Sequence, residues 1–133
     1  GSMLEAMLKV GEMLRIPTIG FEIEEFSHGP TMGLRPNQTI FMIGSDEAEF
    51  DRMLVFRDAY KRYTPRVHVV SMRDLPDADG RDLVFSHRVS KCLAPLASTV
   101  PFQFVAAQGA KDIYIDTAVN PFQESLAHYA DEG

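Results

Sequence analysis

The sequence predicts an α/β fold in which a mainly parallel sheet forms the centre of a single domain. One short, near-continuous apolar segment, residues 39–44, has the composition of a strand that is buried on both faces, and residues 66–71, with three valines, are the next predicted strand. A segment with helical spacing of its apolar residues, 46–63, lies between them. Strand, helix and strand therefore alternate, as in proteins whose parallel strands are joined by crossover helices. A chain of 133 residues is long enough for one domain with a substantial core.

Composition narrows the class of protein. Apolar residues make up 45% of the chain and charged residues 24%, the ordinary balance of a globular protein. No apolar run approaches the ~20 residues that span a bilayer, and the first residues include Glu5 rather than the basic start of a signal peptide. The net charge of −6 argues against nucleic acid or an anionic membrane as a partner. Cys92 is the only cysteine, which excludes an intramolecular disulfide and predicts a cytoplasmic location.

The first helix is predicted to begin at residue 3 or 4 and to end before Pro17, because proline cannot donate inside a helix. At about 100° per residue, three charged side chains fall together on one side: Glu5, Lys9 and Glu12. Two interpretations of this stripe remain open, a surface salt-bridge stripe or a set of charges facing a wet cleft. The apolar residues form a broad arc on the opposite side: Met3, Leu4, Met7, Leu8, Val10 and Leu14.

Residues 18–26 alternate in part between apolar and polar side chains, which predicts a strand with one polar face. Residues 27–30 then form a loop that holds His28, and residues 31–38 continue it. Residues 39–44 are the buried strand, and Asp46 is the expected cap of the helix that reaches about Tyr63. Four side chains of that helix are expected to point inward: Phe50, Met53, Leu54 and Tyr60.

The second half of the chain is predicted to hold two more strands and one long helix. Pro65 ends the preceding helix, and the strand at 66–71 is followed by a turn-rich linker at 74–81 and a short strand at 83–85. An apolar helix runs from Pro95 to about Gly109, with a kink at Pro101. Residues 111–133 form an irregular tail with a possible helix at 123–129.

Two motifs resemble the sugar isomerase (SIS) domain family. Residues 4–12 resemble its Ala-Leu-Lys-Leu-Lys-Glu helix and are followed at 25–30 by Glu-x-x-His-Gly-Pro, while residues 93–103 resemble its late Ala-Pro-x-x-x-Thr-Val-Pro-x-Gln helix. The resemblance covers nearly the whole chain. It is strongest to the second SIS domain of glucosamine-fructose-6-phosphate aminotransferases and to related deglycases.

The resemblance implies a three-layer αβα sandwich with a mainly parallel, flavodoxin-like sheet. Residues 1–133 would be the C-terminal SIS portion of a two-domain enzyme, with the N-terminal SIS domain in cis or on a separate chain. The chain opens directly on a helix, so the first strand of such a domain is missing. It also lacks the family's Ser-x-Ser-Gly-x-Thr loop, which contacts the phosphate. The isolated chain is therefore expected to bind sugar phosphate weakly and to be inactive.

The chemistry of moving a carbonyl between neighbouring sugar carbons requires a base, an acid that opens the ring and a group that stabilises the intermediate. Glu12 is a natural base because partial burial on an apolar helix would raise its basicity, and Lys9 lies one turn away. The resemblance likewise places the catalytic glutamate at Glu12 and the ring-opening histidine at His28. It allows His28 to act in the neighbouring subunit of a homodimer. The substrate-binding candidates on the same segments are Glu5, Ser27 and Gly29.

The tail departs from the aminotransferase pattern, in which a lysine after Leu-Ala forms a Schiff base with the open sugar. Here His128 stands at that place, and no lysine follows Lys111, so the tail supplies no Schiff base. His128 could carry a proton in its stead or have no role. This difference favours a deglycase over an aminotransferase.

No metal or cofactor site is predicted. The four histidines and Cys92 show no zinc spacing, and Cys92 has no base beside it in sequence. His68 alternates with valines on a strand and is expected to be structural, whereas His87 lies in a loop and could line the cleft. Three glutamates at 22–25 could suggest a cation site, but a solvated face is the simpler interpretation.

The sequence thus predicts a domain of a phosphosugar isomerase or deglycase. Glu12 would remove a proton beside the carbonyl or imine of an open-chain hexose 6-phosphate amine adduct, and the amine and a hexose phosphate would be released. The alternatives are the isomerase domain of an aminotransferase and a non-catalytic SIS domain that senses sugar phosphate. A sensor needs no proton abstraction, so the presence of both Glu12 and His28 argues against it.

Overall fold

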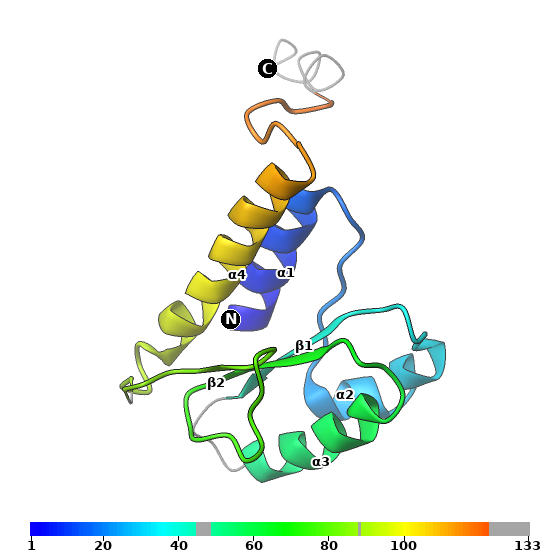
Figure 1. The fold of residues 1–133 in the computed structure, drawn as a ribbon, viewed down its shortest axis with the longest axis vertical. Coiled ribbons are helices and arrows are strands. Elements are labelled where there is room, and N and C mark those ends of the chain that lie inside the picture. Colours follow the sequence, from blue (N-terminus) through cyan, green and yellow to red (C-terminus); the bar gives the residue numbers. More distant parts are fainter. Residues whose placement is uncertain (45–48, 88, 123–133) are drawn as a thin grey trace, which may run out of the picture.

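A three-stranded parallel sheet separates two layers of helices in the computed structural model, which describes residues 1–44, 49–87 and 89–122 (Figure 1). The strands are β1 (Ile40–Gly44), β2 (Val67–Ser71) and β3 (Leu83–Val84), in the order β1-β2-β3. Ile40 pairs with Val67 and Gly44 with Ser71, so β1 and β2 are in register along their whole length. This arrangement confirms the predicted α/β class and the positions of the three predicted strands.

The helix α3 (Phe50–Lys61) is the crossover that joins β1 to β2. Phe50, Met53 and Tyr60 are buried as predicted, and Leu54 is half-buried at the edge of the same cluster. Arg57 is also buried, because its guanidinium donates to the Pro76 carbonyl (2.8 Å) and pairs with its neighbour Asp58. The helix ends two residues before the predicted Tyr63, and the predicted cap Asp46 lies outside the described residues.

The two faces of the sheet carry separate apolar clusters. Val67 and Val69 of β2 point with Met42 toward α3, whereas Val70 points the other way, toward the first helix. The cluster on the α3 side contains Met42, Phe50, Met53, Tyr60, Val67, Val69 and Leu75. The cluster on the other side contains Ala6, Val10, Val70, Phe102 and Ala106. Because the side chains of β2 alternate between the two faces of the sheet, each helical layer packs on its own apolar cluster.

The second layer consists of α1 (Ser2–Leu14) and α4 (Ala94–Asp112), which lie side by side in the same direction (Figure 1). Ser2 Oγ donates to the Pro95 carbonyl (3.3 Å) where the helices begin, and Arg15 Nη2 donates to the Asp116 (2.9 Å) and Val119 (2.7 Å) carbonyls beyond their ends. The α4 helix is longer than predicted at both ends and continues through Pro101.

The prediction of a strand at residues 18–26 is wrong. Residues after α1 have no regular structure until α2 (Ile23–Ser27), a short helix that is followed by the 3₁₀ turn η1 (Pro30–Gly33). Ile23 and Phe26, three residues apart, pack together on the α3-side cluster, which is helical rather than strand spacing. Thr18 Oγ1 donates to the Met7 carbonyl (2.9 Å) and ties the start of the segment to α1.

The helical layers on both faces give the predicted αβα arrangement: α1 and α4 cover one face, and α2 and α3 cover the other (Figure 1). Within the described residues β1 is an edge strand, as expected if a first strand is missing from the chain. Residues 113–122 follow α4 without helix or strand, in agreement with the predicted irregular tail, whereas the possible helix at 123–129 lies outside the described residues.

Candidate active site

The predicted base and its neighbour form an ion pair on the outer face of α1. Lys9 Nζ donates to Glu12 Oε2 at 3.2 Å, and the Glu12 side chain is 63% exposed while that of Lys9 is 37% exposed. The expected partial burial of Glu12 is therefore wrong for this chain. The reason is that Ala6 and Val10 occupy the buried side of α1, about half a turn away from Glu12.

Two exposed leucines precede Glu12 on the same face of α1. Leu4 and Leu8 are 50% and 51% exposed, although the sequence pattern grouped them with the buried apolar arc. Leu4, Leu8 and Glu12 are spaced by four residues, so they form one stripe on the outer face of the helix. We call these three residues the outer stripe of α1. An apolar surface that ends at a carboxylate would become a dry carboxylate site if another surface covered it.

The predicted ring-opening histidine lies on the other side of the sheet. His28 directly follows α2 and is exposed, and its backbone N–H donates to the Glu25 carbonyl (3.2 Å). The Ser27 hydroxyl, a substrate-binding candidate, donates to the Glu24 carbonyl (2.7 Å), and the adjacent Gly29 is exposed.

One copy of the chain does not bring Glu12 and His28 together. The α1 helix packs with Val70 and Phe102 on one face of the sheet, whereas α2 packs with Met42 and Tyr60 on the opposite face. Figure 1 shows the two helices on opposite sides of the strands. Of the other candidates, Glu5 is half-buried one turn before Lys9, and His128 lies outside the described residues. A site that uses both Glu12 and His28 would have to combine two copies.

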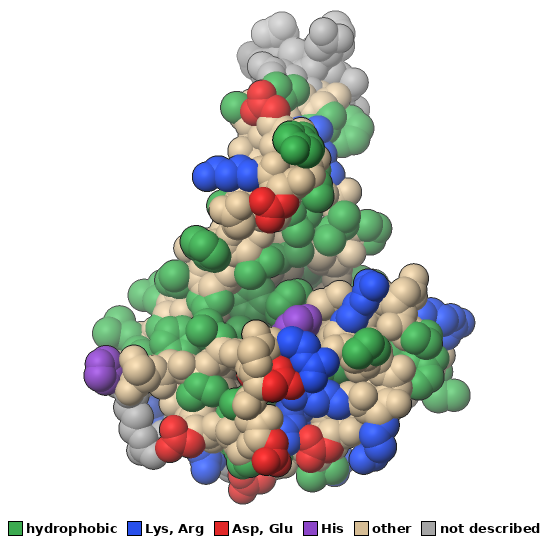
Figure 2. All heavy atoms as spheres, in the orientation of Figure 1, with side chains coloured by type: hydrophobic (Ala, Val, Ile, Leu, Met, Phe, Trp, Pro, Cys, Tyr) green, Lys and Arg blue, Asp and Glu red, His purple; other side chains and the backbone are tan. Residues whose placement is uncertain are grey.

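A large hollow lies along β1, and none of the predicted catalytic residues within the described ranges lines it. It has a volume of about 1210 Å³ and is lined mainly by apolar side chains from α1, α2, α3 and residues 39–44. His87 is exposed and lines neither of these two hollows, so its place in the cleft stays a prediction. Figure 2 shows hydrophobic side chains over the α1–α4 layer and most charged side chains gathered over the other layer.

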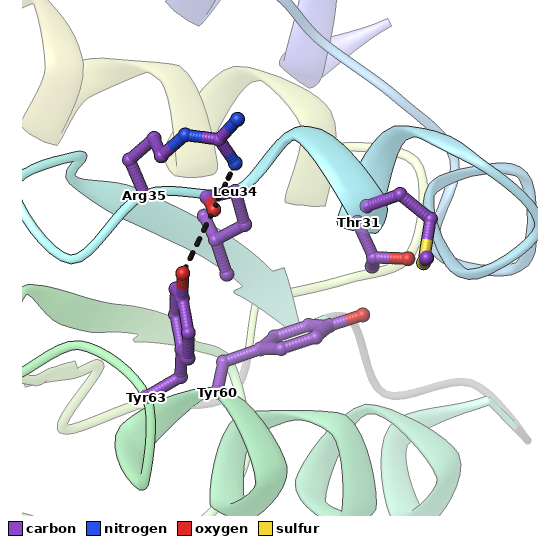
Figure 3. A pocket seen from close by; sticks show the side chains of 6 residues that line it. Thr31, Leu34, Arg35, Tyr60 and Tyr63 are labelled. Atoms are coloured by element: carbon purple, nitrogen blue, oxygen red, sulfur yellow. Dashed lines mark hydrogen bonds between the residues drawn. The ribbon is translucent and has the colours of Figure 1, made fainter.

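The smaller hollow, about 330 Å³, lies between η1 and the end of α3 (Figure 3). Tyr63 Oη and Arg35 Nη1 both donate to the Leu34 carbonyl, at 3.1 Å and 3.0 Å. The Tyr60 hydroxyl points the other way, toward Thr31, and is buried without a hydrogen-bond partner among the described residues. Burial raises the pKa of Tyr60. The sequence pattern identified Tyr60 as a core residue but gave no sign of its unpaired hydroxyl.

The remaining polar clusters of the described residues have structural partners. The Asp82 carboxylate is fully buried and accepts from the Lys61 ammonium (3.3 Å) and the Val69 N–H (3.0 Å). His68 stacks on Phe41, and its Nδ1 lies 2.9 Å from the Arg81 carbonyl oxygen, as expected for a structural histidine.

One of the three glutamates at 22–25, Glu24, has an ion-pair partner. Glu24 pairs with Arg52 across α2 and α3 (2.8 Å), and this hydrogen bond lowers the pKa of Glu24. Across the described residues, no group of three or more His, Cys, Asp or Glu side chains could hold a metal ion. None of the described helices is long and apolar enough to cross a membrane.

Comparison with known proteins identifies the fold. No protein-family model matches the chain, and no curated protein matches it significantly. Among solved structures, a putative phosphosugar isomerase from Clostridium difficile 630 is 25% identical, with a TM-score of 0.77 over 90% of this chain and 33% of its own. A putative sugar binding protein from Salmonella typhimurium LT2 is also 25% identical, with a TM-score of 0.66 over 80% of this chain and 32% of its own.

The chain thus has an SIS-like, phosphosugar isomerase-type fold and spans about a third of the length of these solved structures. The expected resemblance is supported at this level. The neighbours do not distinguish deglycases from aminotransferases.

Proposed function

We propose that this chain carries the base of a phosphosugar isomerase or deglycase, with Glu12 as the base and Lys9 as its partner. The observation that carries the proposal is the Lys9–Glu12 pair at the end of an exposed apolar stripe on α1. A carboxylate that served only in a surface salt bridge would not need exposed leucines beside it. The similarity to a phosphosugar isomerase supports the substrate class.

The substrate would be an open-chain hexose 6-phosphate that carries an amine on C1 and a carbonyl at C2. Glu12 would remove a proton from C1, the electron pair would form a C1–C2 double bond, and the C2 oxygen would take up a proton from water, giving an enaminol. Lys9, 3.2 Å from the carboxylate, would keep Glu12 ionised or stabilise the developing oxyanion. Return of the proton at C2 gives an imine at C1, and addition of water there releases the amine and a hexose 6-phosphate.

His28 would open the sugar ring in the site of a neighbouring copy. The position of α1 and α2 on opposite faces of the sheet supports this division, because a single copy presents the two residues in different directions. Ser27 and Gly29 would approach the substrate with His28, and Glu5 would approach it with Glu12. A homodimer is the simplest assembly that satisfies this geometry.

The isomerase domain of an aminotransferase is the second candidate. It shares the base and the histidine, but His128 stands where that family has the lysine of its Schiff base. A sugar-phosphate sensor is the third candidate and would bind without turnover.

The test is Glu12→Gln in the full-length protein, assayed with a 6-phosphorylated ketoamine and with fructose 6-phosphate. Loss of a general base should lower kcat by at least ~10²-fold while the affinity for the sugar phosphate stays nearly unchanged. Asp51→Asn, an exposed acid at the start of α3, is the matched control and should retain full activity. Equal turnover by the Glu12→Gln variant and the unaltered protein would exclude Glu12 as the base.

A further inference from the structure

The small hollow between η1 and α3 lies where residues 34–38 are bonded to the residues that follow α3. Tyr63 Oη donates to the Leu34 carbonyl (3.1 Å), and Arg66 Nη1 donates to the Asn37 carbonyl (2.9 Å). These bonds join segments that are far apart in the sequence, so two walls of the hollow are held against each other by more than side-chain packing.

The Tyr60 hydroxyl is a buried donor that lacks an acceptor at this hollow. Tyr60 is 8% exposed, and its hydroxyl is the one buried side-chain polar atom without a hydrogen-bond partner in the part of the chain that the structure describes. It points toward Thr31, which also lines the hollow (Figure 3). Nearly all buried polar groups in folded proteins are paired, because an unpaired one costs stability. Burial raises the pKa of Tyr60, so the hydroxyl keeps its proton and can donate.

The surroundings of the hollow are positively charged, although the chain carries a net charge of −6. Arg35 lines the hollow, and Arg62 and Arg66 are exposed on either side of Tyr63 in the sequence. None of these three arginines forms an ion pair with another described residue, and no acidic side chain is among the described residues that line the hollow. The end of α3 contributes a partial negative charge of roughly half an elementary charge, which three arginines exceed. The hollow therefore favours an anion.

The remaining lining selects a flat apolar body for that anion. Met32, Leu34 and the two tyrosine rings supply it. The volume of about 330 Å³ is at the small end of the range for ligand pockets, so the ligand is small. A guanidinium binds a planar carboxylate through two parallel hydrogen bonds, which makes a carboxylate the matching anion for Arg35.

We propose that this hollow binds a small aromatic carboxylate with an uncharged hydrogen-bond acceptor at its far end. The carboxylate binds Arg35, the ring contacts Leu34, and the acceptor receives the Tyr60 hydroxyl. This hydroxyl is covered in the chain alone, so a lining side chain moves as the ligand enters. Met32 is 85% exposed on a four-residue turn and can move at little cost. The site is on the α3 face of the sheet, opposite the helix of Glu12, and does not depend on the proposed reaction.

The test measures the binding of three probes to the full-length protein by equilibrium dialysis. The first, para-acetylbenzoate, has both the charge and the acceptor. The second, para-isopropylbenzoate, has the same shape without the acceptor, and the third, para-acetylbenzamide, lacks the charge. We expect para-acetylbenzoate to bind with a Kd of about 1 mM or lower, the range for a ligand of about 12 non-hydrogen atoms. It should bind at least ~5-fold more tightly than either of the other probes.

Variants assign each preference to its residue. Tyr60→Phe should abolish the preference for the acetyl over the isopropyl probe, and Arg35→Gln should abolish the preference for the benzoate over the benzamide. Arg62→Gln changes an exposed arginine outside the lining, and Tyr114→Phe changes a tyrosine that is 95% exposed after α4. Both controls should keep both preferences. Glu12→Gln should also keep them, which separates this site from the proposed reaction.

Melting temperatures distinguish a ligand-binding Tyr60 from a structural one. Because its hydroxyl has no partner, Tyr60→Phe should leave the melting temperature unchanged or raise it. Tyr63→Phe removes the bond to the Leu34 carbonyl and should lower it. If Tyr60→Phe fails to fold, the comparison of the acetyl and isopropyl probes on the unaltered protein still decides the question.

Three results would overturn the inference. One is equal affinity of the unaltered protein for the acetyl and isopropyl probes, which would mean that no buried donor meets the ligand. Another is a preference for the acetyl probe that persists in Tyr60→Phe. The third is a lower melting temperature for Tyr60→Phe, which would mean that the hydroxyl already has a partner in the full-length protein.

Discussion

The two helical layers differ in the kind of side chain that they expose to solvent. The α2–α3 layer carries its own ion pairs: Glu24 bonds to Arg52, and Arg57 bonds to Asp58. In α4, by contrast, no charged residue occurs from Ala94 to Ala110, yet Leu96, Val100 and Phe104 are 67%, 58% and 70% exposed. Leu4 and Leu8 extend the exposed apolar surface to α1. A helix that is apolar on all sides is normally buried on all sides. The comparison indicates that the outer face of the α2–α3 layer faces solvent, whereas the outer face of the α1–α4 layer has the composition of a surface that another surface covers.

The sharpest test of this difference compares two phenylalanines on α4. Phe102 is 3% exposed and contacts Phe41 edge-on (5.4 Å between ring centroids), while Phe104 points outward. Phe102→Ala should lower the free energy of unfolding of this chain by about 3–5 kcal/mol, because it leaves a cavity in the core. Phe104→Ala should change it by less than about 0.5 kcal/mol. Urea denaturation measures both, and a similar loss in the two variants would mean that the outer face of α4 is already covered.

A second test concerns the buried carboxylate of Asp82, which bonds to Lys61 of α3. Asp82→Ala removes the acceptor of the Val69 N–H and of the Lys61 ammonium. Each buried donor left without a partner costs about 1–3 kcal/mol, so the variant should be destabilised by that order. Asp79→Ala, which alters the more exposed carboxylate of the same cluster, should destabilise the chain much less, because water screens its ion pair with Arg81. If thermal unfolding ranks the two variants in the opposite order, Asp82 does not hold this loop.

The smallest expected effect is a pH dependence at the surface of the α2–α3 layer. The Arg52 hydrogen bond lowers the pKa of Glu24 below its ordinary 4.5. The stabilisation is therefore complete above about pH 4.5 and is lost as the pH falls through the lowered pKa, because the unfolded chain takes up the proton first. Arg52→Gln should reduce stability slightly at about pH 6 and converge with the unaltered chain below the lowered pKa. A difference that persists or grows in acid would assign the loss to Arg52 packing on Phe56 instead.

Sequence predicted the strands well because each has a strong local signal. The apolar run of β1, the valines of β2 and the periodic apolar residues of α1, α3 and α4 correspond to the observed elements. The strand predicted at residues 18–26 is wrong because their partial alternation fits a strand equally well. The path of these residues is determined by the hydrogen bond from Thr18 to Met7 and by the packing of Phe26 on Tyr60. Local patterns contain no such contacts.

The candidate site was predictable in its residues but not in its geometry. The motifs single out Glu12 and His28, but periodicity alone placed Leu4 and Leu8 in the apolar arc and Glu12 in a charged stripe on the opposite side of the helix. The structure instead exposes Leu4, Leu8 and the Glu12 side chain, because Ala6 and Val10 are the residues of α1 that meet Val70 and Phe102. Which arc of an apolar helix meets the core depends on the neighbouring helix, here α4, and on which other surfaces cover the rest.

The most direct test of the proposed site mixes two inactive variants of the full-length protein, Glu12→Gln and His28→Ala. If each site takes its base from one copy and its histidine from another, random exchange makes half of the dimers mixed, and each mixed dimer contains one intact site. The mixture should then recover about a quarter of the unaltered activity, after subunit exchange confirmed by mass spectrometry. A mixture that exchanges subunits and stays as inactive as its components would contradict a site shared between copies.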